Sequence, residues 1–187
     1  IGFYQASGGF GFRDQLQDVL ALLDCAPALA REQINLAASR QFIEGDVLHW
    51  WHDFPLRGVR TRCSDDLLWL PYAVCEFISV VDDDSILKDR APYLQGEALQ
   101  DHELERYAEY QSAEIDGNLY EHCYRAIDAR IAWGNHGLPY IGTGDWNDGL
   151  NRVGEKGQGE SVWMAWFLSV VCLSLIHISE PTRLRSI

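Results

Sequence analysis

The sequence predicts an all-α fold built from helical hairpins. Apolar residues recur at every third or fourth position in five separate stretches, which is the spacing of one helix face. The loops between these stretches are polar and rich in aromatic residues. With 187 residues and 47% hydrophobic content, the chain is long and apolar enough to form one domain with its own core. Long helices in hairpins, joined by such loops, are typical of an (α/α) toroid.

The first two helices are expected in the N-terminal quarter of the chain. One apolar stripe ends ahead of Pro27, and a second ends at Gly45, because proline and glycine commonly terminate helices. The stripes consist of Leu16, Val19, Leu20 and Leu23, and of Ile34, Ala37, Ala38, Phe42 and Ile43. We expect these two helices to pair as a hairpin.

A third helix is expected to begin at Ser64, whose hydroxyl can cap its N-terminus. Asp65 and Asp66 then lie in the first turn, near the positive end of the helix dipole. Its apolar face comprises Leu67, Leu70, Val74, Phe77 or Ile78, and Val81. Pro71 cannot donate a backbone hydrogen bond, so we expect a kink there.

The fourth and fifth helices are expected in the C-terminal half. Asn118 and Glu121 form a capping box, and apolar residues follow at every fourth position up to Gly134. These residues are Leu119, Cys123, Ile127 and Ile131. Residues 162–175 are apolar nearly all round, but they are too few to span a bilayer, which takes about 20 residues. We expect this helix to be buried on all sides.

The exception to helical spacing lies between Ala91 and Tyr110. Short alternating pieces such as residues 92–95, Pro-Tyr-Leu-Gln, indicate a small strand pair or an excursion loop there.

Charge and cysteine content exclude several classes of partner. The chain has 15 basic and 28 acidic side chains, so its net charge of −13 disfavours nucleic acid and anionic membrane surfaces. Its five cysteines show no C-x-x-C spacing and are expected to be free thiols in a reducing compartment. His49 and His52 lack a third ligand nearby, so we expect no metal site. The sequence shows no export leader, which favours a cytoplasmic location.

The most informative segment is residues 143–151, Thr-Gly-Asp-Trp-Asn-Asp-Gly-Leu-Asn. Asp145 and Asp148 flank the indole of Trp146, and glycines allow the backbone to approach a ligand closely. A glycosidic oxygen is a poor leaving group unless it is protonated, and a carboxylic acid can donate that proton. An indole ring can pack on the apolar face of a sugar. The alternative is an Asx turn in which these side chains satisfy their own backbone.

Residues 144–149, with Asn151 close behind, resemble the catalytic signature of glycoside hydrolase family 94. That family contains inverting phosphorylases of β-linked glucosides. Further segments agree in the same order, so the resemblance spans residues 4–168; they are residues 7–15, 45–52, 60–69 and 119–122. Within the family, the sequence of these segments is most similar to the phosphorylase-like domain of cyclic β-1,2-glucan synthases.

The resemblance implies roles for individual residues. The second aspartate of the signature is the general acid in the family, which assigns that role to Asp148. Trp146 is expected to contact the sugar, and Asp145 to order the loop or bind a hydroxyl. Arg13 and Asp14 match a pair that grips the glucosyl unit at the non-reducing end. A simple ion pair at the start of a helix is the alternative for these two residues.

Further residues are expected to lie around this site. Trp50, Trp51 and His52, together with His49, are expected on a loop after Gly45, where they line the entrance to the sugar site. A core aromatic cluster is the alternative. Asp65 and Asp66 are expected to act as capping charges. His122 and His136 are expected in the core or behind the site.

The resemblance also implies an architecture. It predicts an (α/α)6 barrel of about twelve helices, of which this chain supplies about five. Residues 1–170 are then a partial catalytic domain whose partner is the remainder of the barrel. Residues 177–187 change from acidic to basic and are similar to translated sequencing-adapter sequence, so residues 171–187 are expected to be a non-native or disordered tail. An ordinary polar extension is the alternative.

The function implied is phosphorolysis of β-linked gluco-oligosaccharides, with β-1,2 linkages favoured. Inorganic phosphate is the co-substrate, α-glucose 1-phosphate is the product, and no cofactor is expected. The phosphate-binding residues of the family lie downstream of this chain, so the isolated chain is expected to be inactive. An inverting glycoside hydrolase and an inactive carbohydrate-binding fragment are the alternatives. The parent protein is expected in the bacterial cytoplasm or at the inner membrane.

Overall fold

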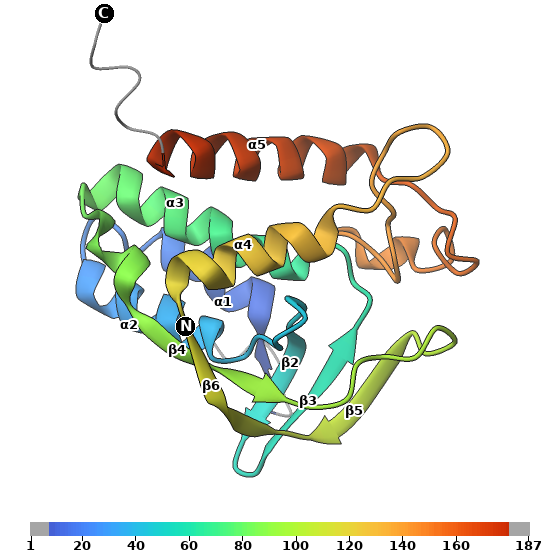
Figure 1. The fold of residues 1–187 in the computed structure, drawn as a ribbon, viewed down its shortest axis with the longest axis horizontal. Coiled ribbons are helices and arrows are strands. Elements are labelled where there is room, and N and C mark those ends of the chain that lie inside the picture. The colour runs from blue at the N-terminus through green and yellow to red at the C-terminus, as the bar shows by residue number, and fades with distance from the viewer. Residues whose placement is uncertain (1–7, 180–187) are drawn as a thin grey trace, which may run out of the picture.

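A computed structural model of the chain describes residues 8–179. These residues form a mixed α/β fold, in which five α-helices pack together and two antiparallel sheets lie beside them (Figure 1). The expected all-α class, and with it the barrel fragment, is therefore wrong. The number of helices agrees with the prediction, whereas most of the strands were not anticipated.

The helices surround one central member. They are α1 (Phe12–Leu20), α2 (Pro27–Ala38), α3 (Trp69–Val81), α4 (Leu119–Arg130) and α5 (Val162–Ser179). The apolar α3 contacts each of the other four, and α1 packs against α2 as the expected hairpin. The core consists of the inward faces of these helices, with Phe12, Leu16, Ile34, Leu70 and Leu119 fully buried.

Two helix boundaries differ from the prediction. The second helix ends at Ala38, and the chain then turns, so that Phe42 reaches the core from a bridge with Leu94. Pro71 is the third residue of α3, where backbone N–H groups have no partner within the helix, so it breaks no helical bond. Ser64 does not cap that helix, because a short 3-10 helix, Asp66–Leu68, precedes it.

The capping box of α4 is confirmed. The Asn118 side chain accepts a hydrogen bond from the Glu121 backbone N–H at 2.9 Å, and the Glu121 carboxylate accepts one from the Asn118 N–H at 2.8 Å. Leu119, Cys123 and Ile127 are buried as expected, whereas Ile131 lies just beyond the helix and is exposed.

The last helix is buried on one face. Met164, Leu168, Val171 and Leu175 face the core, while Trp166, Val170, Leu173 and Ile176 are exposed. The expectation of burial on all sides is therefore wrong for the described chain. The helix also continues through Ser179, past the break expected at residue 177, and so includes the first residues of the tail expected over residues 171–187. The rest of that tail, residues 180–187, lies outside the described residues. Within residues 8–179, no helix is long and apolar enough to cross a membrane.

The strands form two antiparallel sheets. The first has the order β1-β2-β3-β5, and the second pairs β4 with β6. Their bounds are β1 Phe10–Gly11, β2 Leu48–Asp53, β3 Leu56–Thr61, β4 Arg90–Gln95, β5 Glu105–Glu109 and β6 Gln111–Asn118. The strands expected between Ala91 and Tyr110 exist, but β4 and β5 belong to different sheets. The segment of Trp50 and Trp51 is a strand, not the expected loop.

Candidate active site

The loop that carries the signature, residues 143–155 and here called the signature loop, is hydrogen-bonded to the segment that precedes α3. The Gly144 carbonyl accepts hydrogen bonds from the Ser64 backbone N–H at 2.8 Å and from the Ser64 hydroxyl at 3.0 Å. The Thr143 N–H donates to the Arg62 carbonyl at 3.1 Å. Gly142 has a φ of 61°, and a Cβ there would lie 1.9 Å from the Arg62 carbonyl oxygen, so this close approach requires glycine.

Asp145 ties the same loop to α5. Its buried carboxylate accepts hydrogen bonds from the Ser161 hydroxyl at 2.7 Å and from the Asn147 N–H at 2.8 Å. The Ser161 oxygen in turn accepts the Met164 N–H at 3.0 Å, which caps the first turn of α5. Asp145 therefore orders the loop, and its bond to Asn147 is the Asx turn that the sequence left open.

Arg13 joins the first helix to two aspartates far away in the sequence. Its Nη2 lies 2.7 Å from Asp148 Oδ1, and its Nη1 lies 3.2 and 3.3 Å from the two Asp65 carboxylate oxygens. The Asp148 side chain is 73% exposed and follows Asn147 at the start of a short 3-10 helix. The guanidinium therefore holds a carboxylate that remains open to solvent.

Asp14 takes a different position from Arg13. Its carboxylate folds back against Gly11, where an added Cβ would lie 1.9 Å from Asp14 Oδ2. The ion pairs of Arg13 within the described chain go to Asp65 and Asp148, so the alternative of a local pair between Arg13 and Asp14 is not observed.

The buried charges behind Asp148 form a connected set. Asp65 is fully buried and accepts hydrogen bonds from Trp69 Nε1 at 3.0 Å and from the Cys63 thiol at 3.3 Å. Burial and the neighbouring Asp66 carboxylate raise the pKa of Asp65. Burial opposes the charge of Arg13, but Asp65 and Asp148 more than offset it, so the pKa of Arg13 is raised. Arg13 is thus a permanent cation within the site.

His49 is directed toward the site by a β-bulge. Leu48 pairs with Arg60 and Trp50 pairs with Val59, which leaves His49 as the extra residue of β2. Its Nδ1 lies 2.6 Å from Asp66 Oδ2. Burial opposes protonation, but the hydrogen bond and charge of Asp66 more than offset it and raise the pKa of His49. The expectation that Asp65 and Asp66 act as helix caps is wrong, because each binds a side chain.

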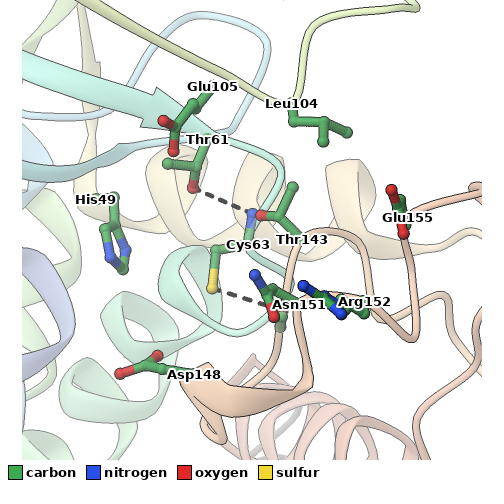
Figure 2. A pocket seen from close by; sticks show the side chains of 11 residues that line it. His49, Thr61, Cys63, Leu104, Glu105, Thr143, Asp148, Asn151, Arg152 and Glu155 are labelled. Carbon is green, nitrogen blue, oxygen red and sulfur yellow. Dashed lines mark hydrogen bonds between the residues drawn. The ribbon is translucent and has the colours of Figure 1, made fainter.

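A pocket of about 460 Å³ opens beside Asp148. Figure 2 shows Cys63 in the middle of the view, with His49 and Asp148 on one side and Arg152 and Glu155 on the other. Its lining residues come from β2, β3, β5 and the signature loop: His49, Thr61, Cys63, Leu104, Glu105, Thr143, Gly144, Asp148, Asn151, Arg152 and Glu155. Residues 148–155, the second half of the loop, thus contribute several side chains to the pocket, whereas Asp145 does not line it.

The expected aromatic residues divide between surface and core. Trp146 is 49% exposed on the signature loop, and Trp50 is half-buried between His52 and Tyr107, with ring centroids 5.4 and 5.5 Å away. Trp51 is only 1% exposed, and its Nε1 donates to Asp53 at 3.0 Å. The structure thus matches the alternative of a core position for Trp51. Of the β2 residues, the lining of the pocket includes His49 but not Trp50, Trp51 or His52.

One group of side chains has the spacing of a metal site. The ligand atoms of His49, Cys63 and Asp66 lie within 4.8 Å of one another. However, burial raises the pKa of the Cys63 thiol, which donates its hydrogen to Asp65, and the cation of Arg13 lies beside the group. His49 and Asp66 already bind each other. These properties do not fit a metal centre, so the sequence prediction of no metal is retained.

His122 and His136, the two histidines expected in the core or behind the site, do not line the pocket. His122 is fully buried, with Nδ1 2.6 Å from Gln41 Oε1 and Nε2 3.1 Å from the Ala91 carbonyl, and burial lowers its pKa. His136 is exposed and lies 2.9 Å from Glu160. His122 is therefore a core residue, and neither side chain contacts the signature loop within the described chain.

Sequence reasoning missed several residues of the site. Asp65 anchors Arg13, Ser161 anchors Asp145, and Glu105 comes to the pocket on β5, for which the sequence predicted a strand or loop but no part in the site. The position of Arg152 and Glu155 directly after the signature is the one signal that was available for them in the sequence.

Comparison with known proteins shows the family of the chain. The family described as Glycosyl hydrolase 94 superfamily, catalytic domain, matches residues 2–184. The cyclic beta-(1,2)-glucan synthase NdvB of Rhizobium meliloti is 54% identical over 168 residues, which are 89% of this chain and 6% of that protein. The solabiose phosphorylase of Paenibacillus borealis is 33% identical over 83% of this chain and 17% of its own length. The cellobionic acid phosphorylase of Neurospora crassa is 27% identical over 81% of this chain and 18% of its length.

The chain therefore spans less than a fifth of these relatives, yet nearly all of it is matched. Such coverage fits one segment of a larger catalytic domain. The family expected from the signature is confirmed: the chain belongs to the glycosyl hydrolase 94 superfamily.

Proposed function

We propose that this chain supplies the general acid and part of the sugar site of an inverting phosphorylase that acts on β-linked gluco-oligosaccharides. The observation that carries the proposal is the position of Asp148, whose exposed carboxylate borders a pocket and is held at 2.7 Å by Arg13. Identity of 54% to a cyclic β-(1,2)-glucan synthase supports β-1,2 linkages as the substrate.

The reaction needs one acid from this chain. The Asp148 carboxyl donates its proton to the glycosidic oxygen as the bond from that oxygen to the anomeric carbon breaks. A phosphate oxygen attacks the anomeric carbon from the opposite face, which inverts the configuration and gives α-glucose 1-phosphate. Arg13 stabilises the carboxylate that remains on Asp148 after proton transfer.

The sugar would be held by residues around this acid. Trp146 offers an exposed indole next to Asp148, and Asp14, Trp50 and His52 are proposed to contact hydroxyls or ring faces. Asp145 acts indirectly, because both of its carboxylate oxygens are engaged within the loop and by Ser161. Trp51 supports β2 from the core.

The residues that bind phosphate are proposed to lie outside this chain. The family places a histidine and a threonine or serine for this purpose downstream of the signature, so we propose that the isolated chain does not turn over substrate. The longer protein would act in the bacterial cytoplasm, where inorganic phosphate is abundant, and it would need no other cofactor.

The test compares Asp148→Asn with Asp145→Asn in a catalytic domain that carries this chain. The assay is phosphate-dependent release of glucose 1-phosphate from β-1,2-gluco-oligosaccharides, with cellobiose as comparison substrate. Loss of a general acid typically lowers the rate about 10²–10⁴-fold, so Asp148→Asn should lose activity while oligosaccharide affinity stays within a few fold. Robust activity in Asp148→Asn, together with inactive Asp145→Asn, would show that Asp145 and not Asp148 is the general acid.

Inverting hydrolysis is the second candidate, because two further carboxylates line the same pocket. Glu105 and Glu155 border it together with Asp148, and an inverting hydrolase needs a second carboxylate to activate water. A hydrolase would release glucose without phosphate and would lose activity in Glu105→Gln or Glu155→Gln. A phosphorylase would require phosphate and, because phosphate is itself the nucleophile, would keep activity in both variants. Absence of sugar turnover in any complete domain would instead favour the binding fragment.

A further inference from the structure

A second cavity adjoins the pocket of Asp148 at Cys63. Its volume is about 510 Å³, and it shares Thr61 and Cys63 with the first pocket. Three arginines line it: Arg60 and Arg62 from the end of β3, and Arg130 from the end of α4. Such a concentration of cations contrasts with the net charge of −13 of the chain, and the three arginines differ in what they bind.

Arg60 is fully engaged by the protein. Its Nε and Nη2 lie 2.6 Å from the two Asp46 carboxylate oxygens, Nη2 also contacts Glu44 at 3.1 Å, and Nη1 donates to the Glu97 carbonyl at 2.8 Å. Arg60 therefore pairs with both carboxylates that line the cavity, Glu44 and Asp46, and its single charge offsets one of their two.

Arg62 is also engaged. It donates to the Glu103 carbonyl at 2.8 Å and to the Gln100 carbonyl at 2.7 Å, which fixes the loop between β4 and β5 over the cavity. Its hydrogen-bonding groups are thus directed toward backbone and not toward the cavity centre.

Arg130 differs from both. Its Nε is shielded from solvent and has no hydrogen-bond partner, and within residues 8–179 its guanidinium forms no ion pair. Burial lowers the pKa of Arg130, and the nearby Asp65 carboxylate, already shared by Arg13 and Trp69, opposes this only in part. Arg130 is half-buried as a whole, but a cation whose Nε loses its water without gaining a partner is costly.

We propose that this cavity is a second binding site, for a small oxyanion of the phosphate or carboxylate type, held by Arg130. A guanidinium presents parallel N–H groups that match two oxygens of such an anion, which is the partner that Arg130 lacks. The three arginines of the lining outnumber its two carboxylates, Glu44 and Asp46, so the lining keeps one net positive charge to attract the anion. The cavity volume leaves room for a group attached to that anion, such as a sugar. The proposal needs only Arg130 and does not rest on the proposed phosphorylase activity.

The test is calorimetric titration of the 187-residue chain with inorganic phosphate, glucose 6-phosphate and glucuronate. We expect saturable binding of at least one probe, weakened about tenfold or more in Arg130→Gln and less in Arg130→Lys, which keeps the charge but loses the paired N–H groups. Arg90→Gln is the matched control, because Arg90 is an exposed arginine paired with Asp116 and lies outside the cavity. Binding of both phosphate probes without glucuronate would identify a phosphate site, and the reverse a carboxylate site.

The thermal stability of the variants distinguishes an anion-binding role of Arg130 from a structural role. Arg130→Gln removes an unpaired buried charge, so in anion-free buffer its melting temperature should equal or exceed that of the wild-type chain. A fall of several degrees would show that Arg130 is a structural residue and would overturn the proposal. Unchanged phosphate affinity in Arg130→Gln would place the anion in the pocket of Asp148 instead, and absence of binding by all three probes would also overturn the proposal.

Discussion

The bond from Ser161 to Asp145 gives the most quantitative test of how the site is held. The Ser161 hydroxyl donates to a buried carboxylate at 2.7 Å and accepts the Met164 N–H at 3.0 Å, so one side chain both fixes the signature loop and caps α5. Loss of an N-cap costs about 1 kcal/mol. Loss of a hydrogen bond to a charged group costs about 1.5–3 kcal/mol. Ser161→Ala should therefore lower the free energy of unfolding by about 2–4 kcal/mol.

The assay is urea unfolding followed by circular dichroism, together with a thermal melt. A loss of this size corresponds to a melting temperature lower by about 5–15 °C in a chain of this length. Ser169→Ala is the matched control, because that hydroxyl lies on the exposed side of the same helix and bonds to the Ala165 carbonyl at 2.7 Å. The control should change stability by less than about 0.5 kcal/mol. Equal effects of the two substitutions would refute the coupling between loop and helix.

Two further predictions concern the loop and the histidine of β2. Gly142→Ala should be more destabilising than Gly137→Ala in the same unfolding assay: both positions have positive φ, but only the first places its Cβ against a backbone carbonyl, and equal losses would contradict this. For His49 the folded-state pKa is raised above its ordinary value of 6.5, so its stabilising contribution is complete below that pH and is lost as the pH rises through the folded-state pKa. The stability difference between wild type and His49→Gln should accordingly shrink between pH 6 and pH 9, and a difference that grows with pH would contradict the pairing with Asp66.

The helices could be predicted from the sequence because their signals are local. Asn118 and Glu121 make reciprocal bonds three residues apart, and the apolar stripe that follows them needs no distant partner to be recognised. The end of α2 could not be predicted in this way. Phe42 continues the apolar spacing, but it is buried by a bridge to Leu94 that lies more than fifty residues later.

The strands outside residues 91–110 were missed because their sequence pattern is broken or polar. In β2 the bulge at His49 interrupts the alternation, so that aromatic residues and histidines read as a loop. The strand β6 is mostly exposed along its length, with Gly117 as its buried residue, so it lacks the apolar side chains that mark a strand. Its position is set by pairing with β4, which a single sequence does not display.

The contact between Arg13 and Asp148 could not be predicted from the sequence. The signature predicted Asp148 as a site residue, and a separate motif predicted Arg13. Their contact at 2.7 Å joins residues that lie 135 positions apart in the sequence. Asp65 and Asp66 were expected to serve their own helix, because acidic residues are common in a first turn. They instead bind Arg13 and His49, since the 3-10 turn before α3 directs them toward the pocket.

The central claim, that Asp148 protonates the departing oxygen, is tested most directly by changing the leaving group. Asp148→Asn, in a catalytic domain that carries this chain, is assayed with phosphate on a β-1,2-gluco-oligosaccharide and on 2,4-dinitrophenyl β-glucoside, whose leaving group departs without a proton. We predict that the variant loses about 10²–10⁴-fold activity on the oligosaccharide and keeps most of its activity on the activated glucoside. Equal losses on the two substrates would contradict the assignment of Asp148 as general acid.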